Sequence, residues 1–342
     1  GDGLVWICGR EIMLIGANNE QARTKIQGLT LIGAYVDEAS TLPESYFNML
    51  YSRLSLAGAR MWLTSNPEGP GHWLLVKWLQ RARLWIDRDG REHRNDAPDA
   101  LNLHRVTFRL DDNPNLDPEY VADLKKSYTG LWYRRYIGAE WVAADGAVYD
   151  CWEQTRHVIA HRDLPKMSRY LGVGLDYGTT NPSAGILLGL GVDRRLYAVD
   201  EWWLRKPADA PGYAPGQQSE SLRAWLAGLP ALPEWVILDP SAAPLKVQLG
   251  QDGVEHLIDA DNHVTYGIAT VSTLLATASL RISDRCVNLI RELPSYSWDD
   301  KATAKGIDAP VKINDHAADA LRYAVTTTES LWRGNIDTRE AA

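Results

Sequence analysis

The sequence predicts two α/β regions in succession, and three observations support this. Within residues 1–145, short apolar runs alternate with stretches of helical period, which is typical of a parallel sheet covered by helices. From residue 169 to 335, three strand-like runs joined by turns precede a helical stretch and a further strand. Between them, residues 146–168 are polar and lack periodicity, so we expect a linker there and a short tail at 336–342.

Composition narrows the class of protein. The 342 residues are 45% hydrophobic and 23% charged, which is ordinary for a globular protein. No apolar run approaches the ~18 residues of a membrane span, and no basic-then-apolar start indicates export. Three widely spaced cysteines predict neither a disulfide framework nor a zinc site. The net charge of -8 gives no global sign of nucleic-acid binding. We therefore expect a soluble intracellular protein whose chemistry comes from local motifs.

In the first region, two buried strands are predicted at residues 31–36 and 61–64, each apolar and each followed by polar residues. The Pro- and Gly-rich stretch 66–71 after the second strand predicts a loop. Helical periodicity and a charged, turn-rich composition predict the remaining elements, namely helices at 43–56, 73–84 and 118–136 and an exposed excursion at 87–100.

In the second region, strands are predicted at residues 170–176, 184–190 and 196–201. The short connections 177–183 and 191–195 contain Gly, Asn and Asp, so neighbouring strands run antiparallel. A helix at 217–226, a strand at 235–238 and a final helix from Asp315 towards residue 331 follow. This order is that of a ribonuclease-H-like α/β domain.

Two acids end the first strand of the first region. Asp37-Glu38 after an apolar run has the form of a Walker B element, in which Asp37 holds Mg²⁺ and Glu38 polarises the attacking water. The alternative is a polar turn in which Glu38 caps a helix. The next strand ends in Thr64-Ser65-Asn66, where a polar residue senses the γ-phosphate in many nucleotide-driven motors.

The phosphate-binding loop of such an ATPase is missing from these residues, because no Gly-x-x-x-x-Gly-Lys-Ser/Thr occurs. We expect the strand that bears it to precede Gly1. The expectation is thus the C-terminal part of a P-loop-type ATPase domain, unable by itself to hydrolyse ATP.

Three acids stand at matching places in the second region. Asp176 ends the first strand, Asp239 ends the fourth, and Asp315 begins the last helix. In a ribonuclease-H-like sheet the first and fourth strands are parallel neighbours ~4.8 Å apart, so their terminal carboxylates face one crevice. Such a cluster is costly unless cations occupy it. Two Mg²⁺ or Mn²⁺ ions would neutralise it, activate water and stabilise a leaving 3′ oxygen.

Each acid also has a simpler interpretation. Asp176 is then a turn residue, Asp239 the end of a strand before Pro240, and Asp315 a helix N-cap. Three neighbours have open roles. Asp319 shares a helix face with Asp315 and either supports the ligands without binding the metal itself or pairs with Arg322. His316 either helps to bind a phosphate or is solvated, and Glu201 is a possible additional carboxylate at the rim.

Eight short stretches, in order along the chain, resemble motifs of the large terminase subunits of tailed phages. The first region contributes Gly28-Leu29-Thr30, Val36-Asp37-Glu38-Ala39 and Thr64-Ser65-Asn66-Pro67-Glu68-Gly69. Asp112-Asn113-Pro114-Asn115-Leu116, with Tyr128-Thr129-Gly130 and Gly138-Ala139-Glu140-Trp141, is similar to the segment before the nuclease. Gly174-Leu175-Asp176-Tyr177-Gly178 and Asn314-Asp315-His316-Ala317-Ala318-Asp319-Ala320-Leu321-Arg322-Tyr323 resemble the nuclease motifs.

The resemblance implies a DNA-packaging motor whose ATPase pumps double-stranded DNA into a procapsid and whose metal-dependent endonuclease cuts the concatemer. It implies ATP-Mg as the motor's cofactor and two Mg²⁺ or Mn²⁺ ions in the nuclease. By motif, Asp37 is the metal-associated acid, Glu38 the catalytic glutamate, and Ser65 and Asn66 the coupling motif. Asp176, Asp239 and Asp315 are the nuclease metal ligands. The implied partners are the portal protein, on which the protein oligomerises, and the small terminase subunit. The implied location is the host cytoplasm, transiently at the portal vertex, with no membrane partner.

DNA contact must be local, given the net charge. The densest basic stretch is diluted by acids and predicts a solvated mixed-charge face, while a second group precedes the final helix and predicts a DNA-facing loop. The first comprises Lys77, Arg81, Arg83, Arg88, Arg91 and Arg94, and the second Lys301, Lys305 and Lys312.

Two other functions stay open: an ATP-driven translocase or helicase whose C-terminal domain binds DNA or the portal without cutting, and a ribonuclease-H-like transposase or resolvase.

Overall fold

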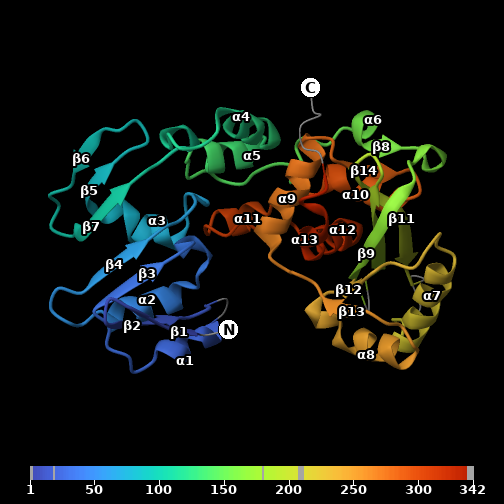
Figure 1. Cartoon of the computed structure of the whole chain (residues 1–342), viewed down its shortest axis with the longest axis horizontal. Coiled ribbons are helices and arrows are strands. Elements are labelled where there is room, and N and C mark those ends of the chain that lie inside the picture. Colours follow the sequence, from blue (N-terminus) through green and yellow to red (C-terminus); the bar gives the residue numbers. More distant parts are fainter. Residues whose placement is uncertain (1–2, 18–19, 179–180, 207–211, 337–342) are drawn as a thin grey trace. The chain divides into compact units, whose positions relative to one another are not determined.

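A computed structural model describes residues 3–17, 20–178, 181–206 and 212–336 (Figure 1). It separates into two compact units. The first contains the described residues up to Asn113 together with Arg134–Ala143 and Ala304–Ile307, and the second contains the rest. Most of the predicted tail, 337–342, and part of the predicted turn 177–183, at 179–180, lie outside the described residues. Within the described part, no helix is long and apolar enough to cross a membrane.

The first unit holds two small sheets and a hairpin with short helices. Its strands are β1 (Gly3–Ile7), β2 (Arg10–Leu14), β3 (Gly33–Val36), β4 (Arg60–Leu63), β5 (Ala82–Ile86), β6 (Glu92–Arg94) and β7 (Leu101–Val106). Its helices are α1 (Arg23–Ile26), α2 (Glu44–Arg53) and α3 (Trp73–Lys77).

The predicted strand–helix–strand order of the first unit is confirmed. Strands β3 and β4 are parallel neighbours with Val36 opposite Leu63, and α2 lies between them in sequence. Phe47 of α2 is buried in the core of this unit, and its ring lies 5.0 Å from that of Trp73 and 5.1 Å from that of Trp78. The parallel pairing places the carboxyl ends of β3 and β4 side by side.

The helix predicted at 73–84 is wrong in its second half, since α3 ends at Lys77 and β5 begins at Ala82. Pairing with distant strands decides the conformation: Trp85 of β5 lies opposite His93 of β6 and Arg105 of β7, and its ring stacks on His93 at 5.0 Å. The stretch predicted as an exposed excursion accordingly includes β6.

The second unit is built on one seven-stranded sheet of order β13-β12-β9-β10-β11-β14-β8. Its strands are β8 (Val158–Ile159), β9 (Met167–Asp176), β10 (Ser183–Gly191), β11 (Leu196–Leu204), β12 (Val236–Leu238), β13 (Leu257–Asp259) and β14 (Leu280–Ser283). Its helices are α4 (Pro118–Ser127), α5 (Gly130–Trp132), α6 (Gln154–His157), α7 (Pro215–Ala227), α8 (Ala243–Gln251), α9 (Val264–Ala276), α10 (Val287–Glu292), α11 (Asp300–Thr303), α12 (His316–Thr327) and α13 (Glu329–Trp332).

The sheet has the strand arrangement predicted for a ribonuclease-H-like domain. Strands β9, β10 and β11 are antiparallel neighbours, and β12 lies parallel beside β9 with Leu238 opposite Leu175. Residues 146–168, where we expected a linker, contribute β8, which adds to the sheet edge at β14. The helix predicted at 118–136 is broken: α4 ends at Ser127, and a π-helical turn spans Tyr133–Ile137.

Strand β9 is buried on both faces, and its two faces differ. Val173 and Leu175 pack with Leu222 of α7 and Leu245 of α8. On the opposite face, Gly174 lets α12 approach the strand directly: a Cβ there would lie 2.1 Å from the Ala320 carbonyl oxygen. Because side chains alternate along a strand, Asp176 projects towards the α12 face. Gly174 therefore brings α12 within reach of Asp176.

Replacing Gly174 by alanine is expected to destabilise the second unit by about 1–3 kcal/mol, the usual cost of overpacking a core. The added methyl group meets backbone atoms of α12, which cannot rotate away as a side chain could. Urea denaturation checks this, with Gly250→Ala in α8 as the control, because its Cβ would meet nothing closer than 3.7 Å. Equal midpoints for Gly174→Ala and the wild type would contradict the packing described.

Candidate functional site

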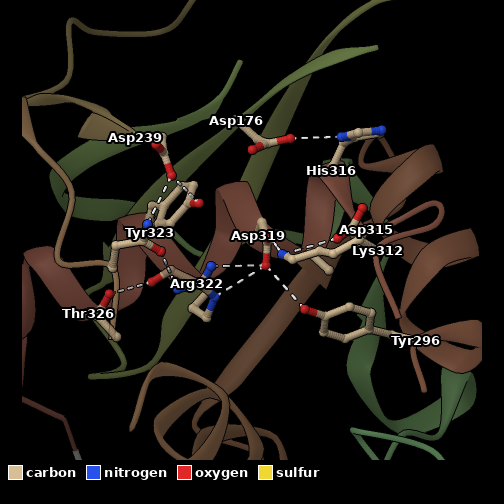
Figure 2. Close-up of polar contacts among 12 residues, drawn as sticks. Asp176, Asp239, Tyr296, Lys312, Asp315, His316, Asp319, Arg322, Tyr323 and Thr326 are labelled. Carbon is tan, nitrogen blue, oxygen red and sulfur yellow. Dashed lines mark hydrogen bonds and ion pairs between the residues drawn. The ribbon is translucent and has the colours of Figure 1, made fainter. Parts of the chain in front are cut away.

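The predicted acids of the second unit gather at one end of β9 and β12 (Figure 2). Asp176 is the last residue of β9, and Asp239 directly follows β12, in the register that pairs Leu175 with Leu238. Asp315 stands immediately before α12, and Asp319 lies one turn into that helix. The structure thus brings Asp176, Asp239 and Asp315 to one region, and Asp319 with them.

Both carboxylate oxygens of Asp239 accept hydrogen bonds. One carboxylate oxygen accepts a hydrogen bond from the Ser241 backbone N–H at 2.7 Å, and the other accepts from the Tyr323 hydroxyl at 2.6 Å and the Asn262 amide at 3.2 Å. Burial favours the protonated form, but the hydrogen bonds from Ser241 and Tyr323 outweigh it and lower the pKa of Asp239. Asp239 is therefore an ionised, oriented carboxylate.

Asp176 has the opposite electrostatic character. Burial raises its pKa, a hydrogen bond with His316 Nδ1 at 2.8 Å opposes the shift, and the charges of Asp319 and Asp315 raise it further. Of these two neighbours, Asp319 acts the more strongly. For His316, burial lowers the pKa, but the bond to Asp176 prevails and raises it. Further positive charge beside Asp176 would lower its pKa and favour the carboxylate.

Both α12 acids are buried and paired. Lys312 Nζ lies 3.2 Å from an Asp315 oxygen and 2.6 Å from an Asp319 oxygen. The other oxygen of Asp319 accepts bonds from Arg322 at 3.1 and 3.2 Å and from the Tyr296 hydroxyl at 3.2 Å. Asp319 thus pairs with Arg322, as one of its two interpretations expected, and it lies among the site acids (Figure 2).

The donor set suits a hard divalent cation, because carboxylate oxygens are the ligands that Mg²⁺ and Mn²⁺ prefer. Two permanently charged side chains, Lys312 and Arg322, pair with this group, and they do not neutralise four carboxylates. In the described residues, however, no three acidic, histidine or cysteine side chains stand close enough together to hold a metal ion.

The first unit brings its predicted site residues together as well. The Thr64 hydroxyl donates to Asp37 at 2.5 Å, and the Asn66 amide lies 3.3 Å from the nearer Glu38 oxygen. The Ser65 hydroxyl accepts from the Ser40 backbone N–H at 3.2 Å. These contacts join the carboxyl ends of β3 and β4, as expected for neighbouring parallel strands.

Glu38 is held in the left-handed region, with φ of 50°, which is uncommon for a residue with a side chain. It stands at the N-cap of a short 3-10 helix, Ala39–Thr41, where its carbonyl oxygen and not its side chain accepts hydrogen bonds from Thr41. Strained backbone of this kind clusters at functional sites, and here it turns the carboxylate towards Asn66.

Arg135 anchors the loop that follows β4. Its buried guanidinium donates to Glu68 at 3.2 Å and to the Val142 carbonyl oxygen at 2.7 Å. Glu68 is two residues beyond Asn66, so the loop that carries Ser65 and Asn66 is fixed at both ends.

Profiles of two protein families match the chain. The family described as phage terminase large subunit matches residues 3–138, and the terminase RNAseH like domain matches residues 259–327. Among solved structures, the large terminase of a thermophilic bacteriophage is 32% identical, with a TM-score of 0.80 over 96% of this chain and 79% of that one. The chain belongs to the phage terminase large-subunit family.

Two further relatives are also large subunits of phage terminases. The terminase large subunit of Escherichia phage T5 is 22% identical over 67% of this chain, and this chain covers 52% of it. The PBSX phage terminase large subunit of Bacillus subtilis is 22% identical over 94% of this chain and 73% of that protein. The chain thus spans about half the length of the T5 protein. The predicted fold class, a terminase ATPase-type α/β region followed by a ribonuclease-H-like domain, is confirmed.

The first basic stretch of this terminase chain has the mixed-charge character predicted. Four of its cations form ion pairs on the surface, Lys77 with Glu44, Arg81 with Asp99, Arg88 with Glu140 and Arg94 with Glu92. In the second basic group, Lys312 lies against the site acids, whereas Lys301 and Lys305 are exposed. A DNA-facing role for the second group stays a prediction.

Several site residues of this terminase chain were not predicted from the sequence. The sequence indicates Arg322 as a partner of Asp319 but gives no role to Tyr323, although its spacing of four residues from Asp319 could have indicated contact with the same site. Asn262, Tyr296 and Glu292 come from other elements, and no local pattern indicates them. Glu201, considered as a rim carboxylate, instead accepts hydrogen bonds from the Asn288 and Leu289 backbone N–H groups and caps α10.

Proposed function

We propose that the second unit is a metal-dependent endonuclease that cuts double-stranded DNA. The observation that carries the proposal is the meeting of Asp176 and Asp239, from the ends of parallel strands, with the acids of α12. Asp176, Asp239 and Asp315 are the proposed metal ligands, and Asp319 joins them. Bound Mg²⁺ or Mn²⁺, two per site, would supply an activated water and stabilise the leaving oxygen.

The chain's own residues prepare the site for this chemistry. Tyr323 and Ser241 fix the rotamer of Asp239, and Arg322 fixes that of Asp319. His316 holds Asp176 by one oxygen. Lys312, whose side chain is 59% exposed, is the accessible cation beside the acids and is proposed to meet a DNA phosphate.

For the intact protein we propose ATP-driven packaging of DNA into a procapsid, with Asp37 holding ATP-Mg, Glu38 as catalytic glutamate and Ser65 and Asn66 in the coupling loop. The contacts of Glu38 with Asn66 and of Asp37 with Thr64 support this. The large terminase of the thermophilic phage, 32% identical, has been solved in complex with ADP. The proposed partners are the portal protein, on which the subunits assemble as an oligomer, and the small terminase subunit, in the host cytoplasm.

The nuclease proposal predicts that the chain nicks and linearises supercoiled plasmid in millimolar Mn²⁺ or Mg²⁺ and that EDTA stops the reaction. Asp37→Ala, which alters the other unit, is the matched control and is expected to cut as the wild type does. Retention of plasmid in a gel-shift assay without cutting in either metal would instead favour a translocase whose second domain binds DNA.

A further inference from the structure

Helix α12 carries His316 and Asp319 on its first turn and directly follows Asp315, so the position of that turn affects the geometry of the site. The first N–H groups of any helix have no partner within the helix and need an acceptor from elsewhere. Asp315 occupies the N-cap position, where aspartate commonly supplies that acceptor. Here its side chain makes no capping hydrogen bond and contacts Lys312 instead.

Glu292, the last residue of α10, supplies the missing acceptor. One of its carboxylate oxygens accepts hydrogen bonds from the Ala317 N–H at 2.7 Å and the Ala318 N–H at 3.1 Å. Glu292 is only 4% exposed, so water does not compete for these two groups. A residue 25 positions away in sequence thus caps α12 in place of its own N-cap residue.

We propose that Glu292 is a positioning residue of the nuclease site. By capping α12 it leaves the Asp315 carboxylate free to face the metal site, and it fixes the turn that presents His316 and Asp319. The inference rests on the proposed nuclease function.

The surroundings of Glu292 shift its pKa in both directions. Burial raises the pKa of Glu292 to about 7, while the N–H groups of Ala318 and Ala317 and the charge of His316 lower it and the charge of Asp315 raises it. The positive end of the α12 dipole favours the carboxylate as well. Glu292 differs from the four site acids because its carboxylate is held by two backbone N–H groups of α12 and not by a side chain of the site.

Without Glu292, two buried N–H groups would lose their acceptor. Asp315 is the nearest residue that can replace it, by turning its carboxylate back over the helix as an ordinary N-cap. That rotation would withdraw Asp315 from Lys312 and from the site. The loss of Glu292 is therefore expected to reduce cutting through the arrangement of α12.

The test compares Mn²⁺-dependent plasmid cleavage by the full chain and three variants. Glu292→Ala is expected to cut about 10–100-fold more slowly, the usual cost of losing a group that orients a metal ligand. Glu292→Gln keeps an oxygen that accepts both N–H bonds and is expected to stay within about threefold of wild type. Asp117→Ala removes the cap of α4, where Asp117 accepts from the Glu119 N–H at 2.8 Å, and is expected to cut normally.

Hydrogen exchange at the Ala317 and Ala318 amides supplies a readout independent of cutting. An N-cap aspartate accepts from one N–H group, so in Glu292→Ala at least one of the two amides keeps no acceptor even if Asp315 turns back. Exchange at that amide is expected to accelerate about tenfold or more, and exchange at both is expected to stay slow in Glu292→Gln. Unchanged exchange, or wild-type cleavage by folded Glu292→Ala, would overturn the proposal. If the wild type itself does not cut, the nuclease proposal fails, and exchange alone decides the role of Glu292.

A further variant covers the case in which Glu292→Ala does not fold. Glu292→Asp keeps the charge but withdraws the carboxylate by one methylene, so that it no longer reaches both N–H groups. It is expected to cut more slowly than Glu292→Gln, and the reverse order would overturn the proposal.

Discussion

Asp176→Asn is expected to abolish metal-dependent cutting, with a loss of at least about 100-fold. The loss of a metal ligand should reduce activity more than the 10–100-fold typical of losing a residue that hydrogen-bonds to a ligand. The fold is expected to survive the change. Burial raises the pKa of Asp176, so the folded state disfavours its charged form, and that penalty applies above the unfolded pKa and vanishes in acid. At neutral pH the asparagine variant should therefore be at least as stable as the wild type.

Plasmid cleavage and urea denaturation, measured side by side, check both halves of this prediction. Asp163→Asn is the matched control, since Asp163 belongs to the same unit and its side chain is 63% exposed. Cleavage by Asp176→Asn at the control's rate would remove Asp176 from the proposed site. A marked loss of stability would show that its charge serves the fold.

Arg322→Met is expected to lower the free energy of unfolding of the second unit by about 3–5 kcal/mol, the cost of breaking a buried ion pair from one side. Arg322 is 1% exposed and bonds Asp319 through two nitrogens, and a third reaches the Asn262 side chain at 3.3 Å. Asn262 in turn donates to Asp239. The same substitution therefore loosens both Asp319 and Asp239, and cleavage should fall with stability.

The double variant Arg322→Met with Asp319→Asn separates the two effects. Removing both charges eliminates the uncompensated acid, so most of the lost stability should return while cutting stays low. Arg333→Met is the control, because the Arg333 side chain is 63% exposed and its pair with Glu329 should contribute less than about 1 kcal/mol. A single Arg322→Met variant within that same range of the wild type would contradict a structural role for this pair.

The ends of the strands in both units could be predicted from sequence, because a buried apolar residue is followed there directly by a polar one. Val36 is buried and Asp37 is exposed, and Leu238 is buried where Asp239 faces the site. The ribonuclease-H-like order also followed from local turns and from apolar run lengths. These features need no knowledge of distant partners.

The features that the sequence did not predict depend on contacts between segments far apart in the chain. Residues 82–86 show apolar spacing compatible with a helix, yet β7, about twenty residues further on, draws them into a strand. The capping of α12 by Glu292 and the hydrogen bond from Tyr296 to Asp319 likewise join different elements. The sequence also does not predict that Asp319 lies near Asp176. Its spacing to Arg322 indicates an ordinary ion pair within the helix, and its proximity to Asp176 emerges only in the fold.

The central claim is that these acids form a divalent-metal site, and X-ray diffraction at the manganese absorption edge tests it most directly. Crystals of the chain soaked in millimolar Mn²⁺ are predicted to show anomalous peaks about 2.0–2.2 Å from oxygens of Asp176 and Asp239 and of at least one α12 acid. The same soak of Asp176→Asn should weaken or remove them. Wild-type crystals with no anomalous peak near Asp176 and Asp239 would contradict the claim.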